Sequence, residues 1–379
     1  MTGRQKIEAA LSRDGTSEIP GVICYEHIFL RDHWNKLTSC PWWQSYSPEI
    51  ESQILWRREA FSKIGHDWFE LPAFYTRKER QDFTIEVLHD GIFLTDKNTG
   101  KKEKLEEPQI GGTKNDDGLA ADTDNLPETQ DDIDAAISAL TVFDTKDDIE
   151  DGSGDLAARL LNEFGSDKFP IFHVLSPLWK CYFIWGFEGL MMMTAANPDA
   201  VKYACSRFLE ISKKEVGKAA SLGAAGIWIE ECFTDIISPE AFKLLNIPYV
   251  SQLIDVIHAA GLKSIYYFTG NPMGRLDQLI STGTDAISLE ESKKGFKAEI
   301  EDITEAVRGR CTVLGNLDSV EVLQNGTEEQ LRQEIKRQLA VGRLNNNRFI
   351  MSLGSPVTPA TSVEKVRLYC DLVHELGAV

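Results

Sequence analysis

The stretch "GIWIEECFTDIISPEAFKLLNIPYVSQLIDVIHAAGLKSIYYFTGN", Gly226 to Asn271, contains two short apolar runs with a longer helical stretch between them. The runs Gly226–Glu230 and Ser264–Phe268 are each followed by polar residues or glycine. An uninterrupted apolar run of this length is typical of a strand buried on both faces. Pro239–Ala260 has the periodicity of a helix. The stretch therefore predicts two parallel strands joined by a helix.

The same alternation runs along most of the chain. Six further apolar runs are interpreted as strands: Gly21–Tyr25, Asp67–Leu71, Pro170–Leu175, Asp285–Leu289, Thr312–Asn316 and Arg348–Leu353. Further helices are predicted at Pro198–Ala220, Met273–Thr282 and Thr327–Val341. Eight strands alternating with helices predict an α/β fold of the (β/α)₈ TIM-barrel type. A doubly wound open sheet is the alternative that this pattern leaves open.

The chain of 379 residues is expected to form one barrel domain with an insertion at 83–155, after the second strand. The first part of the insertion, Phe83–Pro108, alternates apolar and polar residues around Asp90-Gly91, which predicts an antiparallel β-ribbon. The second part, Asn115–Asp155, holds fourteen acids and one lysine. Apart from a short helix predicted at Asp131–Leu140, we expect this acidic segment to lie on the surface.

Charge and hydropathy exclude several classes of protein. The net charge is −19, of which the acidic segment contributes −13 (fourteen acids against one lysine). A protein that binds nucleic acid needs clustered Lys and Arg, so we expect that this acidic chain does not bind nucleic acid. Prolines and charged residues interrupt the most apolar run, Phe169–Met193, which argues against a membrane span. Seven cysteines without a CxxC pair, and an amphipathic N-terminus, predict a cytoplasmic protein with reduced thiols.

Acidic residues gather where the predicted strands end. In a barrel of this type the chemistry lies at the C-terminal ends of the strands. Glu230-Glu231 and Glu290-Glu291 follow two of the strands. Buried acids cost free energy unless they are paired, so Glu230, Glu231 and Glu290 are candidate catalytic residues. Ion pairs with neighbouring basic residues, such as Lys293, are the structural alternative.

Other polar and aromatic residues at the strand ends are candidates for binding a ligand: His27, Trp179, Asn271, Asn316, Asp318 and Ser355. For Asn316 and Asp318 the alternative is a turn that starts the next helix. For His27 it is a hydrogen bond within the scaffold, and we expect the other histidines to be structural. The tryptophans at 34, 42, 43, 179 and 185 are numerous enough to line a site for a flat ligand, with core packing as the alternative.

Six segments of the second half of the chain occur in register from Phe169 onward: "FPIFHVLSPLWKCYFIWGFEGLMMMTAANPDAV", "GAAGIWIEECFTDIISPEAFKLLNIPYVSQLI", "GLKSIYYFTGN", "GTDAISLEE", "VLGNLDSVEVLQNGTEEQL" and "FIMSLGSPVTPATSVEKV". Together they resemble the uroporphyrinogen decarboxylase superfamily. This resemblance implies a (β/α)₈ barrel, in agreement with the strand pattern. The superfamily contains cofactor-free tetrapyrrole decarboxylases and corrinoid-linked methyltransferases.

Two departures from the family patterns distinguish these chemistries. The decarboxylases carry an arginine-rich N-terminal segment of the type RQAGRYLPEY, which this chain lacks. The zinc-dependent methyltransferases carry His-x-Cys after strand five and Cys after strand eight. The matching positions here are Tyr267, Thr269 and Ser355, which are poor zinc ligands. We therefore expect that the protein has no catalytic zinc site of that type and no other metal site.

The resemblance thus implies a methyltransferase that moves a methyl group between a small methylated substrate, a methyl ether or a methylamine, and a corrinoid held on a separate partner protein. The loss of the zinc ligands leads us to the hypothesis that the substrate is demethylated. A general acid would protonate the leaving group, and Glu230, Glu231, Glu290 or Tyr267 would supply it. Exposed apolar residues in the ribbon are compatible with a homodimer. The alternatives are a uroporphyrinogen decarboxylase-type lyase of porphyrin biosynthesis and a barrel without catalytic activity.

Overall fold

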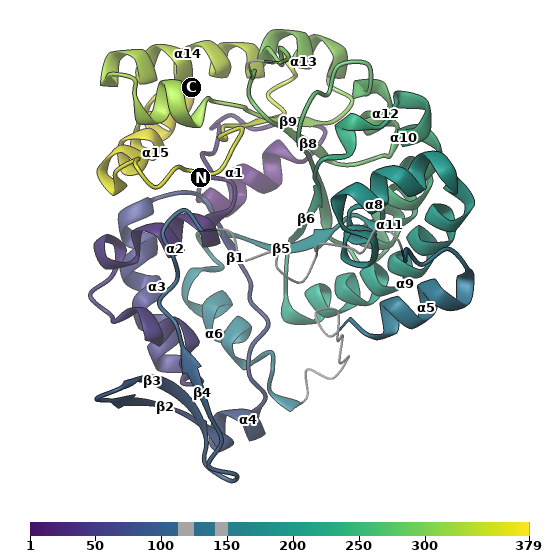
Figure 1. Ribbon diagram of the computed structural model, residues 1–379. Helices are drawn as coiled ribbons and strands as arrows, with labels where there is room; N and C mark the ends of the chain where they lie inside the picture. The colour runs from purple at the N-terminus through teal and green to yellow at the C-terminus, as the bar shows by residue number, and fades with distance from the viewer. Residues whose placement is uncertain (113–124, 141–150, 294, 379) are drawn as a thin grey trace.

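Seven parallel strands form the central sheet of the protein (Figure 1). The computed structural model describes residues 1–112, 125–140, 151–293 and 295–378. In sheet order the strands are β1 (Trp68–Glu70), β5 (Phe169–Leu175), β6 (Gly226–Glu231), β7 (Lys263–Phe268), β8 (Ala286–Leu289), β9 (Thr312–Leu314) and β10 (Phe349–Ile350). Each lies within a few residues of a predicted strand, because the apolar runs mark segments buried on both faces.

The first predicted strand, Gly21–Tyr25, is the one that the structure does not contain as a strand. In its place a single bridge joins the two edges of the sheet. Gly21 forms a parallel bridge with Met351, where Val22 donates a hydrogen bond of 2.9 Å to the Met351 carbonyl. On the other side, the Asp67 amide donates to the Gly21 carbonyl at 2.9 Å. These bonds connect β10 to β1, so the sheet has the ring topology of a TIM-like barrel rather than that of an open sheet.

Helices surround the sheet, and the chain ends lie near each other (Figure 1). Their bounds are α1 (Gly3–Ala10), α2 (Glu26–Leu37), α3 (Ile50–Ile64), α4 (Arg77–Asp82), α5 (Gln130–Ser138), α6 (Asp155–Phe164), α7 (Pro177–Lys180), α8 (Tyr182–Ala196), α9 (Pro198–Leu222), α10 (Pro239–Leu245), α11 (Ile247–Ala259), α12 (Leu276–Ser281), α13 (Ile300–Val307), α14 (Glu328–Leu344) and α15 (Val363–Gly377). Among the described residues, no helix combines the length and the hydropathy needed to cross a membrane.

One predicted helix is divided in two. The stretch Pro239–Ala260 contains α10 and α11, which are separated at Asn246. The side-chain amide of this buried residue donates hydrogen bonds to Glu231 and to the hydroxyl of Tyr266. The break therefore brings a polar side chain into the layer between the sheet and its helices.

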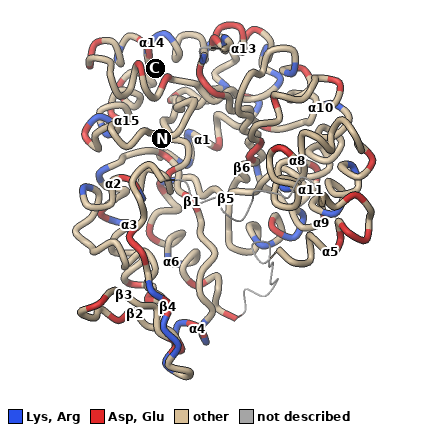
Figure 2. Tube along the Cα trace, viewed as in Figure 1, with Lys and Arg blue, Asp and Glu red and all other residues tan. Residues whose placement is uncertain are grey.

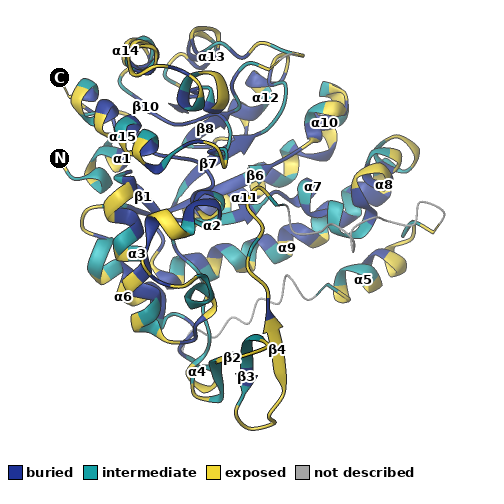
Figure 3. Cartoon of the chain, turned by 60° about the vertical axis from the view of Figure 1, so that its left-hand side comes forward, coloured by how far each residue is buried: buried dark blue, intermediate teal, exposed yellow. Residues whose placement is uncertain are grey.

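A second, antiparallel sheet projects from the barrel between β1 and β5 in the chain. It consists of β2 (Phe83–Leu88), β3 (Gly91–Asp96) and β4 (Lys102–Leu105). Lysines line β4, the blue stretch in Figure 2, and Figure 3 shows that this sheet is more exposed than the central one. Of the predicted acidic segment, residues 115–124 and 141–150 lie outside the described residues, and α5 occurs where the helix is predicted.

Asp67 is expected to stabilise the closed ring. Its Oδ2 atom accepts a 2.7 Å hydrogen bond from the buried amide of Gly21 and lies 2.9 Å from Nε2 of His374. Asp67→Ala leaves the Gly21 amide without this acceptor, so we predict a loss of about 2 kcal/mol in the free energy of unfolding. Urea denaturation measures this change. Asp67→Asn is the matched control and should lose less, because it retains an acceptor; equal stability of Asp67→Ala and the unmodified protein would contradict the assignment.

Candidate active site

A left-handed residue places α2 over the C-terminal end of the barrel. Tyr25 has φ 51° and ψ 53°, a conformation that costs a bulky residue about 1 kcal/mol or more. The turn at Tyr25 starts α2 at once, which directs His27 toward the mouth of the barrel. The ring of this strained residue packs against the ring of Tyr267, with centroids 5.5 Å apart. Backbone strain of this kind occurs preferentially at functional sites.

Aromatic rings fill the barrel below its mouth. Trp228 stacks on Tyr267 with ring centroids 4.9 Å apart, and on His173 at 5.9 Å. Trp68 meets Trp228 edge to face at 5.4 Å. The hydroxyl of Tyr267 donates a 3.0 Å hydrogen bond to the Gly354 carbonyl, and burial raises its pKa well above the ordinary value. Tyr267 therefore belongs to the floor of the site, and any ligand would lie above it.

Three side chains from separate elements meet at one side of the mouth. Nδ1 of His27 lies 3.3 Å from Oε2 of Glu70, and Nε2 of His173 lies 4.0 Å from the same oxygen. Burial disfavours the charged imidazole of His27, but the hydrogen bond and charge of Glu70 outweigh it and raise the pKa of His27. Burial likewise disfavours the Glu70 carboxylate, yet the charges of both histidines lower its pKa to about 2.

Further acids lie along the mouth from β6 to β8. Glu230 is half-buried, and its Oε1 accepts a 3.2 Å hydrogen bond from the thiol of Cys232. Glu290 accepts from the Gly270 amide at 2.9 Å, and burial raises the pKa of its carboxyl. The structure thus brings Glu230 and Glu290 to the mouth, together with Tyr267 and His27.

Ser355 lies between the second acidic pair and a lysine. Its hydroxyl donates to Glu291 at 2.8 Å and accepts from Lys293 at 2.8 Å. Lys293 also pairs with Glu291, so the structural alternative holds for that acid. The hydroxyl of Ser355 lies 3.5 Å from Glu290, which leaves it within the same group of side chains.

Glu231 points away from the mouth. Successive residues on a strand face opposite sides, and Glu231 lies between the sheet and the helices while Glu230 faces the mouth. The buried carboxylate accepts hydrogen bonds from Asn246 and from the hydroxyl of Tyr266, the latter at 3.1 Å. These contacts give Glu231 a structural position, separate from that of Glu230.

Three other predicted binding residues use their side chains within the loops. Nδ2 of Asn316 donates to the Glu290 carbonyl at 3.1 Å, which ties two of the strand ends together. Asp318 accepts from two backbone amides and caps the following short helix, as the alternative interpretation holds. Oδ1 of Asn271 accepts from the Met273 amide at 3.0 Å.

Trp179 lies in an aromatic patch at the rim of the mouth. Its ring is 4.8 Å from that of Tyr182 and 5.4 Å from that of Phe233. Phe233 is 54% exposed and is also in the left-handed conformation, with φ 59°. Trp179 is thus near the mouth but is turned toward its outer rim.

Glu70 and His173 are not among the residues selected from the sequence, although Glu70 lies in the predicted strand Asp67–Leu71. Strand order carries a signal for both residues, since His27, Glu70 and His173 come from three consecutive segments of the ring.

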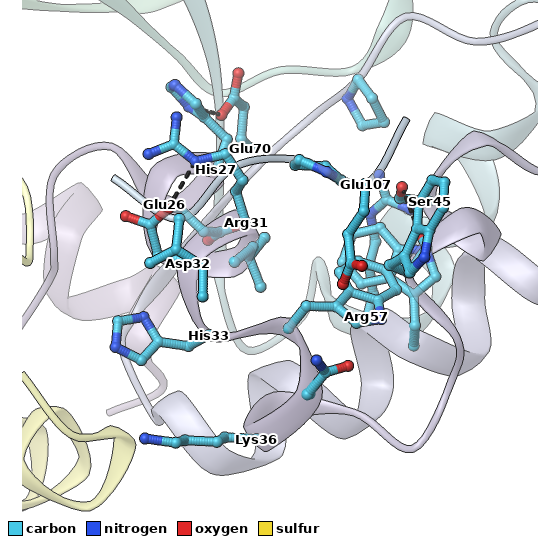
Figure 4. Close-up of a pocket in the computed structure, with 18 residues that line it drawn as sticks. Glu26, His27, Arg31, Asp32, His33, Lys36, Ser45, Arg57, Glu70 and Glu107 are labelled. Atoms are coloured by element: carbon cyan, nitrogen blue, oxygen red, sulfur yellow. Dashed lines mark hydrogen bonds and ion pairs between the residues drawn. The ribbon is translucent and has the colours of Figure 1, made fainter. Parts of the chain in front are cut away.

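A cavity of about 450 Å³ adjoins the histidine–glutamate cluster (Figure 4). His27 and Glu70 lie together at one edge of it, and the remaining lining includes Trp34, Trp42, Trp56, Arg57, Glu107 and Ile110. The segment that follows β4 forms part of its wall, held by a 3.0 Å hydrogen bond from the Gly111 amide to Asp32. Two of the tryptophans expected to line a site are in this cavity, whereas Trp185 is a core residue.

The model of the family described as uroporphyrinogen decarboxylase (URO-D) matches residues 127–376. The chain belongs to this family. A uroporphyrinogen decarboxylase of Thermodesulfovibrio yellowstonii is 26% identical over 179 residues, 47% of this chain and 49% of that protein. The methylcobamide:CoM methyltransferase MtbA of Methanosarcina acetivorans is 26% identical over 134 residues, 35% and 37% of the two chains. The chain thus matches about half, or less, of the length of these relatives.

A solved structure extends the likeness to the whole chain. A methyltransferase from Methanosarcina mazei shares the fold with a TM-score of 0.65 at 16% identity, over 99% of both chains. This agreement shows a common TIM-like architecture. His27 and Glu70 lie before the part that the family model matches, so the family assignment does not bear on them.

Glu231 gives a pH-dependent test of its buried position. Burial raises its pKa to about 7, against hydrogen bonds that oppose the shift. From pH 4.5 to 7 the folded protein then holds this proton while the unfolded chain has lost it, so Glu231 makes the fold less stable as pH rises. We predict that Glu231→Gln is more stable than the unmodified protein at pH 8, by up to about 3 kcal/mol. Urea denaturation at pH 5 and 8 should show the difference shrinking at pH 5; a constant difference would contradict the buried, protonated carboxyl.

Proposed function

We propose that the protein transfers a methyl group between a small methylated substrate and a corrinoid carried by a separate protein. The reaction takes place at the mouth of the barrel, where Glu230, Glu290 and the histidine–glutamate cluster converge. Family membership supports an enzyme of this superfamily, and the named relatives include both methyltransferases and decarboxylases.

The charge of the mouth carries the choice between these chemistries. Glu70, Glu230 and Glu291 supply carboxylates there, beside the acid Glu290, and Lys293 is already paired with Glu291. A porphyrinogen with eight carboxylates requires a cationic site, because like charges at close range repel. The acidic mouth instead suits a small substrate that is neutral or positively charged, such as a methyl ether or a methylamine.

The rim of the mouth offers a surface against which a partner's corrinoid can lie. Phe187 and Phe233 pack with ring centroids 5.8 Å apart, and both are exposed. Exposed apolar side chains next to a site are typical of a docking surface. A reduced corrinoid would supply a strong nucleophile toward methyl groups, and the residues of this chain would position the substrate and its proton donor.

The adjoining cavity suits the substrate. Its volume of about 450 Å³ lies in the range of small-molecule sites. Trp34 and Trp56 form part of the wall with ring centroids 4.9 Å apart, and flat apolar groups pack well against such rings. An aromatic methyl ether held here would point its methoxy group past His27 and Glu70 into the mouth, toward Glu230 and Glu290.

Glu290 is the proposed proton donor. Its raised pKa lets the carboxyl hold a proton closer to neutral pH, and the leaving oxygen or nitrogen of a demethylated substrate needs one. The 2.9 Å hydrogen bond from the Gly270 amide fixes the direction of this carboxyl. Glu230 faces the same space and is the second acid of the proposed site.

Decarboxylation is the second candidate, because several matching relatives are named uroporphyrinogen decarboxylase. Incubation of the protein with uroporphyrinogen, followed by chromatography of the products, separates the two reactions. We predict unchanged uroporphyrinogen; its stepwise loss of carboxyl groups would replace the methyltransferase proposal.

The activity test mixes the protein with reduced cobalamin or a reduced corrinoid protein and a panel of aromatic methyl ethers and methylamines. We predict a change in the visible spectrum of the corrinoid that requires both the protein and one class of substrate. A panel without any such change would contradict the proposal.

Variants of two acids then test the role of the β8 end and of the face of β6 that lies away from the mouth. Glu290→Gln should lower kcat by about 100-fold or more, because general acid catalysis contributes that much. Glu231→Gln, on the other face of its strand, should stay within about twofold of the unmodified rate. Equal rates for Glu290→Gln and the unmodified protein would exclude Glu290 as the proton donor.

A further inference from the structure

Three potential metal ligands converge from separate parts of the chain at the edge of the mouth. His27 comes from the first turn of α2, Glu70 from the end of β1, and His173 from β5. One ligand atom of each lies within 4.8 Å of the other two. The chain separation is large, so the barrel and not local sequence brings them together.

The distances are close to those of a filled site. Zinc binds imidazole nitrogens and carboxylate oxygens at about 2.0–2.2 Å, so neighbouring ligands of a tetrahedral ion are separated by about 3.3 Å. The His27–Glu70 pair already has this separation, at 3.3 Å, and the His173–Glu70 pair exceeds it by less than 1 Å, at 4.0 Å. Small rotations of the side chains would complete the geometry.

We propose that His27, Glu70 and His173 bind a divalent transition-metal ion of the zinc class, with its remaining coordination position facing the 450 Å³ cavity. Two histidines and one carboxylate form a known ligand set of catalytic zinc, which keeps one position open for water or substrate. Calcium and magnesium prefer ligand sets made of oxygen alone. The binding of the ion stands apart from the proposed methyl transfer.

The surroundings hold the ligands in place. The His173 ring stacks on Trp228 with an interplanar angle of 18°, and the ring of Tyr25 packs edge-on against both imidazoles at 5.9 and 6.3 Å. The strained turn at Tyr25 directs His27 to the site. Glu26, the neighbouring acid, instead lies 2.9 Å from the buried His66 and is separate from the three ligands.

The site differs from the one that the family resemblance implies for zinc-dependent members. Those positions correspond to Tyr267, Thr269 and Ser355, at the ends of β7 and β10. The proposed ligands come instead from α2, β1 and β5, on the other side of the ring closure. If the proposed function holds, an ion here would polarise the substrate oxygen or nitrogen and so assist the departure of the methyl group.

The test is calorimetric titration of untagged, chelator-treated protein with Zn²⁺ alone. We predict binding of one equivalent. His27→Ala, Glu70→Gln and His173→Ala should each weaken it by about 100-fold or more, since even changes in residues behind a ligand cost up to that much. His258→Gln is the matched control. His258 lies away from the cluster, where its Nε2 is 2.9 Å from Asp285, so this variant should bind Zn²⁺ as the unmodified protein does.

A second readout protects the test from variants that fold poorly. Co²⁺ in place of Zn²⁺ should give the visible absorption of a four-coordinate ion in the unmodified protein and in His258→Gln, and this absorption should be lost in His173→Ala while its circular dichroism stays unchanged. Absence of stoichiometric binding, or equal binding in the three ligand variants, would overturn the proposal. Because neither measurement involves methyl transfer, a failed activity test leaves this result standing.

Discussion

The closure of the ring at residues 20–22 is the constraint on which the rest of the structure depends. The segment bonds to β10 on one side and to β1 on the other, and it has room for one bridge only before Tyr25 turns left-handed. This short closure decides where α2 begins. Because α2 begins directly after the bridge, His27 in its first turn lies over the mouth next to Glu70. The energetic cost of the Tyr25 conformation is offset by the packing of its ring against Tyr267 and Trp228.

The two sides of the mouth have different characters. On the side of β7 and β10, Tyr267 is committed to a hydrogen bond with the Gly354 carbonyl, and Ser355 is engaged by Glu291 and Lys293. On the side of β1 and β5, the histidine–glutamate cluster borders a cavity. Within the proposed function, the first side supplies a proton donor in Glu290, and the second holds the substrate. This proposed arrangement differs from the one that the family resemblance implies for zinc-dependent members.

Much of the barrel could be predicted from sequence because burial on both faces leaves a direct mark: a continuous apolar run. Features that depend on a few backbone bonds leave no such mark. The end of the first strand at a bridge, and the break of a helix at Asn246, result from contacts between distant residues. For the acids, the sequence shows that Glu230 and Glu231 must face opposite sides, but only the register of β6 with β7 assigns each to its side.

The candidate site was predictable to the same degree. Strand ends identified Glu230, Glu290 and His27, since the barrel gathers them at one mouth. The positions of the strand ends could not show that the side chains of Asn316, Asp318 and Asn271 form hydrogen bonds within the loops. His173 was interpreted as structural because it lies inside its strand, two residues before the strand ends, and not in the loop that follows.

The most direct test of the account is X-ray diffraction from crystals soaked with Zn²⁺, with data collected on both sides of the zinc absorption edge. We expect a strong anomalous peak about 2.0–2.2 Å from Nδ1 of His27, from a carboxylate oxygen of Glu70 and from Nε2 of His173, at the edge of the cavity. A peak elsewhere at the mouth, with these three side chains free of metal, would contradict it.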